Sequence, residues 1–292
     1  MSRIEKALEK AVKMRETPKA ILPAEVMPVE APPAWRGIEA AGDIIDPALV
    51  DGHIVSLTDP HSTAAEQYKK LRARILRATR KDILNTIMVT SSDIGEGKSM
   101  TAINLAVTLS NEIDHTVLLV DTDLRNPSLH KYLGIEPKIG LSDYLKGGIN
   151  LPDVLIRTGI GKLVILPGGN PDPNAAELLS SDRMKMLVRE MKLRYKDRYV
   201  IFDSSPLLVI ADALSLGNYM DGILFVIQEG RTSQKTAMQA LSLMEGWNIL
   251  GIVFNNVPQY LSKGTYPYYY RYDQQGRQQK SDGNGGDDAR RL

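Results

Sequence analysis

The chain has 292 residues, of which 43% are hydrophobic and 24% are charged. This composition is typical of a soluble globular protein and excludes a fibrous or wholly disordered chain. Thirty-six Lys and Arg side chains nearly balance 35 Asp and Glu, so the formal net charge of +1 creates no overall field that would attract nucleic acid or anionic lipid.

The chain contains no cysteine. A disulfide framework, a thiolate metal site and Cys-based nucleophilic catalysis are therefore excluded, and a reducing, cytoplasmic compartment is expected. The N-terminus does not resemble a secretory signal, and no run approaches the roughly 20 apolar residues of a membrane span. We expect no nucleic-acid partner.

Residues 1–55 are expected to form an extension ahead of the globular domain. Ile4, Leu8 and Val12 are spaced four apart among charged residues, which predicts a short amphipathic helix that could dock on a partner. The proline-rich stretch from Pro18 to Pro33 favours an extended, disordered linker. We place the domain boundary near Val55.

Between residues 56 and 257, short apolar runs alternate with segments of helical periodicity. Continuous hydrophobicity predicts strands buried on both faces, and the intervening helices predict parallel crossovers. We therefore expect a doubly wound α/β fold with a mostly parallel sheet, in which ligands bind beyond the carboxyl ends of the strands. The predicted strands are Ile87 to Thr90, Thr116 to Asp121, Leu163 to Leu166, Tyr199 to Asp203, Gly222 to Ile227 and Ile249 to Phe254.

A glycine-containing loop, residues 91–99 (Ser-Ser-Asp-Ile-Gly-Glu-Gly-Lys-Ser), follows the first predicted strand. The glycines allow a tight turn whose backbone N–H groups converge on phosphate, and the Lys and Ser that follow can bind phosphate and Mg²⁺. This is a P-loop of the deviant Walker A type, because Ser92 stands where the strict pattern has Gly. A glycine-rich turn that binds nothing is the alternative. The residues expected to contact ATP are Gly95, Glu96, Gly97, Lys98, Ser99 and Met100.

Carboxylates follow two other predicted strands. Asp121 ends the second predicted strand, and Asp123 and Arg125 follow it. Asp203 ends the fourth, as the Walker B Asp of P-loop enzymes does. Such groups can serve as metal ligand, general base or charge partner. Each could instead cap the next helix, but their convergence at one sheet edge favours a site. We expect Mg²⁺ to be held by Ser99, Asp123 and Asp203.

Together these motifs resemble the bacterial tyrosine kinases, the P-loop autokinases of exopolysaccharide and capsule gene clusters. The resemblance covers roughly residues 66–257, and Asp-x-Asp-x-Arg at 121–125 is its most specific part. Residues 2–8 further resemble the exosortase-associated type. The other matching segments are residues 91–99, 140–145, 166–169, 177–181 and 202–206.

The resemblance implies roles for the predicted site residues. Lys98 and Ser99 would hold the nucleotide phosphates and magnesium, and Asp123 and Asp203 would complete the metal and water shell. Asp121 would accept the tyrosine hydroxyl proton, and Arg125 would complete the catalytic set. Phosphoryl transfer depends mainly on positioning and charge stabilisation, so such a set suffices without His or Cys.

Residues 258–292 are too polar to bury a core and are expected to form a flexible, disordered tail. The tail contains a tyrosine cluster that resembles the acceptor cluster of these kinases, and transfer to a neighbouring subunit is expected. An aromatic segment that binds a partner is the alternative. The expected phosphoacceptors are Tyr260, Tyr266, Tyr268, Tyr269, Tyr270 and Tyr272.

The resemblance also implies partners. A homo-oligomer, such as a ring, would form through a helix face that here carries Glu66, Lys69 and Arg72. Lys69 replaces an Arg of the family pattern. A solvated face that mediates no assembly is the alternative. A separate membrane protein that controls polysaccharide chain length, a co-polymerase, would activate the kinase at the inner face of the membrane. A tyrosine phosphatase would reverse the modification.

Two alternative functions remain open. The first is a partitioning-type ATPase, but those enzymes carry a signature Lys five residues before the loop Lys, where this chain has Asp93. An Asp there cannot reach across a dimer to phosphate, which favours the kinase. The second alternative is a non-catalytic, ATP-gated scaffold of polysaccharide machinery that uses the tyrosine tail as a docking peptide.

Overall fold

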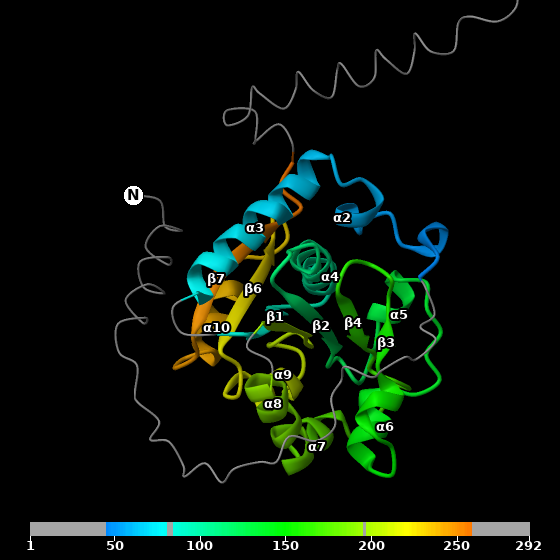
Figure 1. Ribbon diagram of the computed structural model, residues 1–292. Coiled ribbons are helices and arrows are strands. Elements are labelled where there is room, and N and C mark those ends of the chain that lie inside the picture. Colours follow the sequence, from blue (N-terminus) through cyan, green and yellow to red (C-terminus); the bar gives the residue numbers. More distant parts are fainter. Residues whose placement is uncertain (1–44, 81–83, 195–196, 259–292) are drawn as a thin grey trace, which may run out of the picture. The chain divides into compact units, whose positions relative to one another are not determined.

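The computed structural model describes residues 45–80, 84–194 and 197–258. Within them the chain forms a seven-stranded sheet in the order β3-β4-β2-β5-β1-β6-β7, with helices on both faces (Figure 1). Every neighbouring pair is parallel except β3 with β4. The strands are β1 (Thr86–Ser91), β2 (Thr116–Asp121), β3 (Ile156–Arg157), β4 (Leu163–Leu166), β5 (Arg198–Asp203), β6 (Gly222–Gln228) and β7 (Ile249–Asn255).

The expected doubly wound, mostly parallel fold is confirmed. Each of the six predicted apolar runs lies within one strand, namely β1, β2 and β4 to β7. The antiparallel edge strand β3 was not predicted. It has two residues and an intermediate-then-exposed burial pattern, so it leaves no hydrophobic run in the sequence.

The central strands are mainly apolar because they contribute to two cores. Successive side chains of a strand point to opposite faces, so Val200 and Phe202 of β5 lie in one apolar cluster and Ile201 lies in the other. All three side chains are fully buried. Burial of each such side chain stabilises the fold by about 1.5–3 kcal/mol.

The helices divide between the two faces according to the apolar cluster that they contribute to. None of those described is long and apolar enough to cross a membrane. One face is covered by α2 (Val55–Thr58), α3 (Thr63–Thr79), α4 (Lys98–Ser110) and α5 (Leu129–Tyr132). The other is covered by α6 (Leu141–Lys146), α7 (Ala175–Ser180), α8 (Asp182–Arg194), α9 (Asp212–Gly217) and α10 (Gln234–Leu243).

Residues 45–54, which the sequence analysis assigned to the extension, pack against the first of these faces. Ile45, Val50 and Ile54 are buried. The Ser56 N–H just after them donates to the Asn104 side chain of α4 at 2.8 Å. The physical reason is that these aliphatic side chains join the same apolar cluster as the buried residues of α4. The predicted N-terminal helix and proline-rich linker lie outside the described residues.

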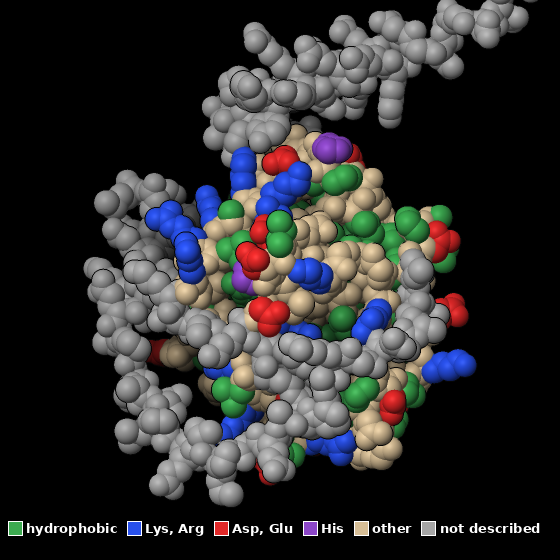
Figure 2. Space-filling view, in the orientation of Figure 1, with side chains coloured by type: hydrophobic (Ala, Val, Ile, Leu, Met, Phe, Trp, Pro, Cys, Tyr) green, Lys and Arg blue, Asp and Glu red, His purple; other side chains and the backbone are tan. Residues whose placement is uncertain are grey.

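Lys and Arg side chains gather over α3 in the space-filling view (Figure 2). The face expected to mediate assembly is used within the chain: Lys69 pairs with Glu66, and Arg72 pairs with Glu112 at 2.9 Å. Arg72 also donates to the Thr108 carbonyl of α4 at 3.1 Å. The Arg72 contacts tie α3 to α4 and to the turn that follows α4.

The strand order brings three carboxyl ends together. β5 lies between β1 and β2, although β2 follows β1 in the chain. In this register Asp121, the last residue of β2, is directly opposite Asp203, the last residue of β5. The loop after β1 leaves the sheet beside them, because Val89 of β1 is also opposite Asp203.

Replacing Ile54 tests whether residues 45–54 belong to the folded domain. Ile54 is fully buried, whereas Leu49 is 61% exposed. Ile54→Ala should lower the free energy of unfolding by about 2–5 kcal/mol, and Leu49→Ala should change it by no more than about 0.5 kcal/mol. Urea unfolding followed by circular dichroism measures both; equal effects would contradict the packing described here.

Candidate active site

The loop between β1 and α4 turns on two glycines with positive φ. Gly95 has φ of 78° and Gly97 has φ of 93°, a conformation that L side chains rarely adopt. A β-carbon on Gly97 would also collide with the Asn255 side chain at the end of β7. The loop therefore requires glycine at these positions, as the sequence analysis expected.

The backbone N–H groups of residues 95–99 donate no hydrogen bond to any residue that the structure describes. They lie where the loop enters the first turn of α4, which begins at Lys98. Free N–H groups at a helix N-terminus in a tight glycine loop form a binding site for phosphate. Gly95, Glu96, Gly97, Lys98 and Ser99 lie together in this loop, and their contact with ATP stays a prediction.

Glu96 has a second contact set. Its buried carboxylate accepts hydrogen bonds from the N–H groups of Ser92 at 2.7 Å and Asp93 at 3.0 Å, and from the Thr232 hydroxyl. Asn255 donates to the Glu96 carbonyl at 3.0 Å. The Glu96 side chain thus holds the loop in shape, and only the backbone of Glu96 remains to face a ligand. Sequence reasoning missed Thr232 and Asn255, which follow or end the neighbouring strands β6 and β7.

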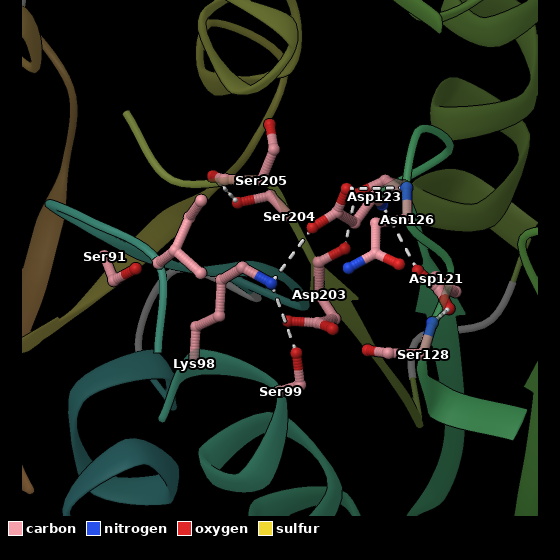
Figure 3. Close-up of polar contacts among 12 residues, drawn as sticks. Ser91, Lys98, Ser99, Asp121, Asp123, Asn126, Ser128, Asp203, Ser204 and Ser205 are labelled. Atoms are coloured by element: carbon pink, nitrogen blue, oxygen red, sulfur yellow. Dashed lines mark hydrogen bonds and ion pairs between the residues drawn. The ribbon is translucent and has the colours of Figure 1, made fainter. Parts of the chain in front are cut away.

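Lys98 extends from the start of α4 toward the carboxylates (Figure 3). Its Nζ lies 3.1 Å from an Asp123 carboxylate oxygen and 3.2 Å from the Ser99 hydroxyl. Burial opposes the charge on Lys98, but Asp203, Asp123 and Asp121 outweigh burial and raise the pKa of its ammonium group. Lys98 is therefore a fixed cation, balanced in this structure by the acidic side chains around it.

Asp121 is fully buried at the end of β2. It accepts hydrogen bonds from the N–H groups of Ser128 at 2.9 Å and Leu129 at 3.1 Å, so it also caps α5. Burial and the facing Asp203 raise the pKa of Asp121 to about 7, against the lowering effect of these N–H groups and Lys98. Its proton affinity therefore suits proton exchange near neutral pH.

Asp203 is the second fully buried carboxylate. Burial raises its pKa to about 6, while Lys98 and the Ser99 hydroxyl lower it and Asp123 raises it. Within the described part of the chain, neither carboxylate oxygen of Asp203 has a hydrogen-bond partner of good geometry. A buried carboxylate with free lone pairs is costly unless a ligand or ion completes it, so Asp203 is suited to such a ligand.

Arg125 and Met100 lie at the edge of this group. The Arg125 guanidinium binds both carboxylate oxygens of the buried Asp212 of α9, at 2.8 Å and 3.3 Å. It also donates to the Pro173 carbonyl at 3.0 Å. The pKa of Arg125 is raised by Asp212. Arg125 thus clamps the loop after β2 to α9. Met100, in the first turn of α4, packs partly buried against the core.

The arrangement brings together a phosphate-binding loop, one partly buried cation and three buried carboxylates. That combination can bind a nucleoside triphosphate, and it places acidic groups where a terminal phosphate would lie. The six tyrosines expected to accept phosphate, Tyr260 to Tyr272, lie outside the described residues.

Comparison with known proteins agrees with this geometry. A family model described as the CobQ/CobB/MinD/ParA nucleotide binding domain matches residues 87–267. In solved structures the septum site-determining protein MinD of Pyrococcus horikoshii, complexed with Mg-ADP, has a TM-score of 0.50 at 25% identity, covering 59% of this chain and 70% of that one.

Tyrosine kinases match more closely. The tyrosine-protein kinase YwqD of Bacillus subtilis is 37% identical over 220 residues, which cover 74% of this chain and 91% of YwqD. The kinase domain of the Escherichia coli tyrosine kinase ETK has a TM-score of 0.66 at 30% identity, covering 70% of this chain and 80% of that one. The chain therefore carries a CobQ/CobB/MinD/ParA nucleotide-binding domain and belongs to the bacterial tyrosine-protein kinases.

Proposed function

We propose that this protein is an ATP-dependent autokinase that transfers phosphate to tyrosines of its own C-terminal cluster on a neighbouring subunit, and that this transfer regulates exopolysaccharide synthesis or export. The observation that carries the proposal is the convergence of Lys98 with Asp121, Asp123 and Asp203 beside a preformed phosphate loop. This set supplies both phosphate binding and a proton acceptor.

Magnesium is proposed to bind with the nucleotide. Among the described residues, the Asp203 carboxylate oxygens have no hydrogen-bond partner of good geometry, and the Ser99 hydroxyl lies close enough to lower the Asp203 pKa; these are the hard oxygen donors that Mg²⁺ prefers. The described residues contain no group of three or more His, Asp or Glu that could hold a metal alone. That suits an ion whose other ligands are phosphate and water, with Asp123 in the outer shell. Bound there, Mg²⁺ would offset charge on the transferred phosphate.

In the proposed reaction a bond forms between a tyrosine oxygen and the γ-phosphorus while the bond from that phosphorus to the bridging oxygen of ADP breaks. We assign the hydroxyl proton to Asp121, because its pKa of about 7 lets it accept a proton near neutral pH. Lys98 would stabilise charge on the phosphate oxygens, and the loop N–H groups would orient them.

The partners follow from the resemblance to the exopolysaccharide kinases. The acceptors are Tyr260, Tyr266, Tyr268, Tyr269, Tyr270 and Tyr272 of another copy of the chain, so a homo-oligomer, such as a ring, is part of the proposal. A membrane co-polymerase would activate the kinase and hold it at the inner face of the membrane, and a tyrosine phosphatase would reset it.

An observation weighs against one of the two alternatives, and an experiment separates both from this proposal. A partitioning-type ATPase would need a cation five residues before Lys98, and the exposed Asp93 there uses a carboxylate oxygen to accept the Ile94 N–H at 2.7 Å. A scaffold would bind nucleotide without transferring phosphate. Mass spectrometry of the tail before and after incubation with ATP distinguishes the kinase from both.

Lys98→Met should reduce phosphotyrosine formation by about 10²-fold or more, because it removes a charge that stabilises the transition state. The fold should persist, since the buried carboxylates can take up protons. Lys138→Met, at an exposed position, is the matched control and should retain activity. Phosphotyrosine immunoblots and circular dichroism are the measurements. Full phosphorylation of Lys98→Met would remove the central claim.

Asp203→Asn should alter the pH dependence of stability in the nucleotide-free protein. The pKa values of Asp203 and Asp121 are raised from 3.8 to about 6 and about 7. The folded state therefore binds more protons than the unfolded state at pH values between 3.8 and about 7. Stability contributed by these groups therefore falls as the pH rises through this window.

Urea unfolding at pH 5 and pH 8 measures this effect. The wild-type protein should lose more stability between the two pH values than Asp203→Asn does. Asp114→Asn, at an exposed position, should follow the wild type. If the stability of Asp203→Asn and of the wild type changed equally with pH, folding would not raise the pKa of the Asp203 carboxylate.

Transfer between subunits is tested by mixing two defective proteins. Full-length Lys98→Met keeps the tyrosines but lacks the catalytic cation, and a protein cut after Val257 keeps the site but lacks the tyrosines. Phosphate from ATP should appear on the Lys98→Met chain only when both are present. Absence of transfer in the mixture, with an active wild type alongside, would place the acceptor in the same chain.

A further inference from the structure

The loop between β6 and α10, residues 229–233, is fastened to the phosphate loop. The Thr232 hydroxyl donates to the buried Glu96 carboxylate and accepts the Gln228 N–H at 2.9 Å. β6 and β1 are neighbouring parallel strands, so both loops leave the same edge of the sheet. Thr232 therefore fixes the position of the residue before it, Arg231, relative to the nucleotide site.

Arg231 lies directly against the phosphate loop. A β-carbon on Gly95 would lie 2.8 Å from the Arg231 Nη1 atom and 3.3 Å from its Cζ atom, so the guanidinium packs on the backbone of Gly95. The Arg231 guanidinium forms no ion pair with a described residue. The guanidinium also donates no hydrogen bond to a described residue. Arg231 is exposed and keeps its donors free.

The side chains around Lys98 carry more negative than positive charge. Lys98 is bound to Asp123 and shares the field of Asp121 and Asp203, so the inner site has more carboxylates than cations. Arg125 is committed to Asp212. Arg231 is thus the cation beside this loop whose charge no described carboxylate balances, and a nucleotide brings the phosphate charge that would balance it.

We propose that Arg231 binds the phosphates of the nucleotide held by residues 95–99, and that the contact between Thr232 and Glu96 positions it. The guanidinium supplies planar, paired donors that match phosphate oxygens, and it lies against Gly95, whose own N–H is free for the same ligand. The proposal concerns nucleotide binding and does not depend on tyrosine phosphorylation.

Calorimetric titration of the full-length protein with ADP, inorganic pyrophosphate and adenosine, in buffer containing magnesium, tests the contact. Arg231→Gln should bind ADP and pyrophosphate at least about tenfold more weakly than the wild type, the effect of one lost charge-assisted contact, and adenosine no differently. Lys235→Gln, four residues on and also exposed, removes the same charge from α10 and should leave all three affinities unchanged.

Unchanged ADP affinity in Arg231→Gln would overturn the proposal. Weaker ADP binding with unchanged pyrophosphate binding would also overturn it, because the contact would then be to the base or ribose. Equal losses in Arg231→Gln and Lys235→Gln would reduce the effect to general surface charge and contradict a specific contact. A phosphotransfer assay on the same proteins is read separately, so failure of the kinase proposal leaves this result interpretable.

Thr232→Val tests the positioning contact, since it keeps the side-chain volume and removes the hydroxyl that Glu96 accepts. Pyrophosphate binding should weaken in Thr232→Val, and adding Arg231→Gln should weaken it little further, because both changes remove the same contact. Fully additive losses would mean that Thr232 does not act through Arg231. Thermal unfolding of each variant verifies that the fold is retained.

Discussion

The site is built on an electrostatic constraint: two carboxylates, Asp121 and Asp203, are buried opposite each other at adjacent strand ends. Burial opposes ionisation of both, and a neighbouring carboxylate adds to this cost: Asp203 acts on Asp121, and Asp123 acts on Asp203. Lys98 offsets part of it from the neighbouring helix, which requires β1, β2 and β5 to lie side by side and α4 to begin where it does. The strand order is therefore a condition for the chemistry as well as a means of burying the sheet.

The surrounding contacts explain how these acidic side chains are held in place. Asp121 is held by two N–H groups at the start of α5, and Arg125 fixes the following loop on Asp212. Asp203 is left without comparable support. The two carboxylates therefore differ in support: Asp121 is oriented by backbone N–H groups, and Asp203 is not.

Much of this was predictable because it depends on local sequence. Continuous apolar runs mark buried parallel strands, and Gly95 and Gly97 mark a backbone conformation that other residues resist. The pairing of Arg125 with Asp212, the anchoring of Glu96 by Thr232 and the packing of Ile45 to Ile54 on α4 were not predicted. Each joins segments far apart in the chain through one or a few side chains, and no spacing rule records such a pairing.

The Glu96 carboxylate occupies the N–H groups of Ser92 and Asp93 inside a loop that otherwise gathers anions. An internal anion of this kind fixes the loop while the chain folds, so the conformational entropy of ordering it is not lost again each time a ligand arrives. Nucleotide association should then proceed without a slow closing step at this loop. A loop with one stable shape therefore favours both rapid association and firm binding of the nucleotide phosphates, because neither requires the backbone to be ordered anew.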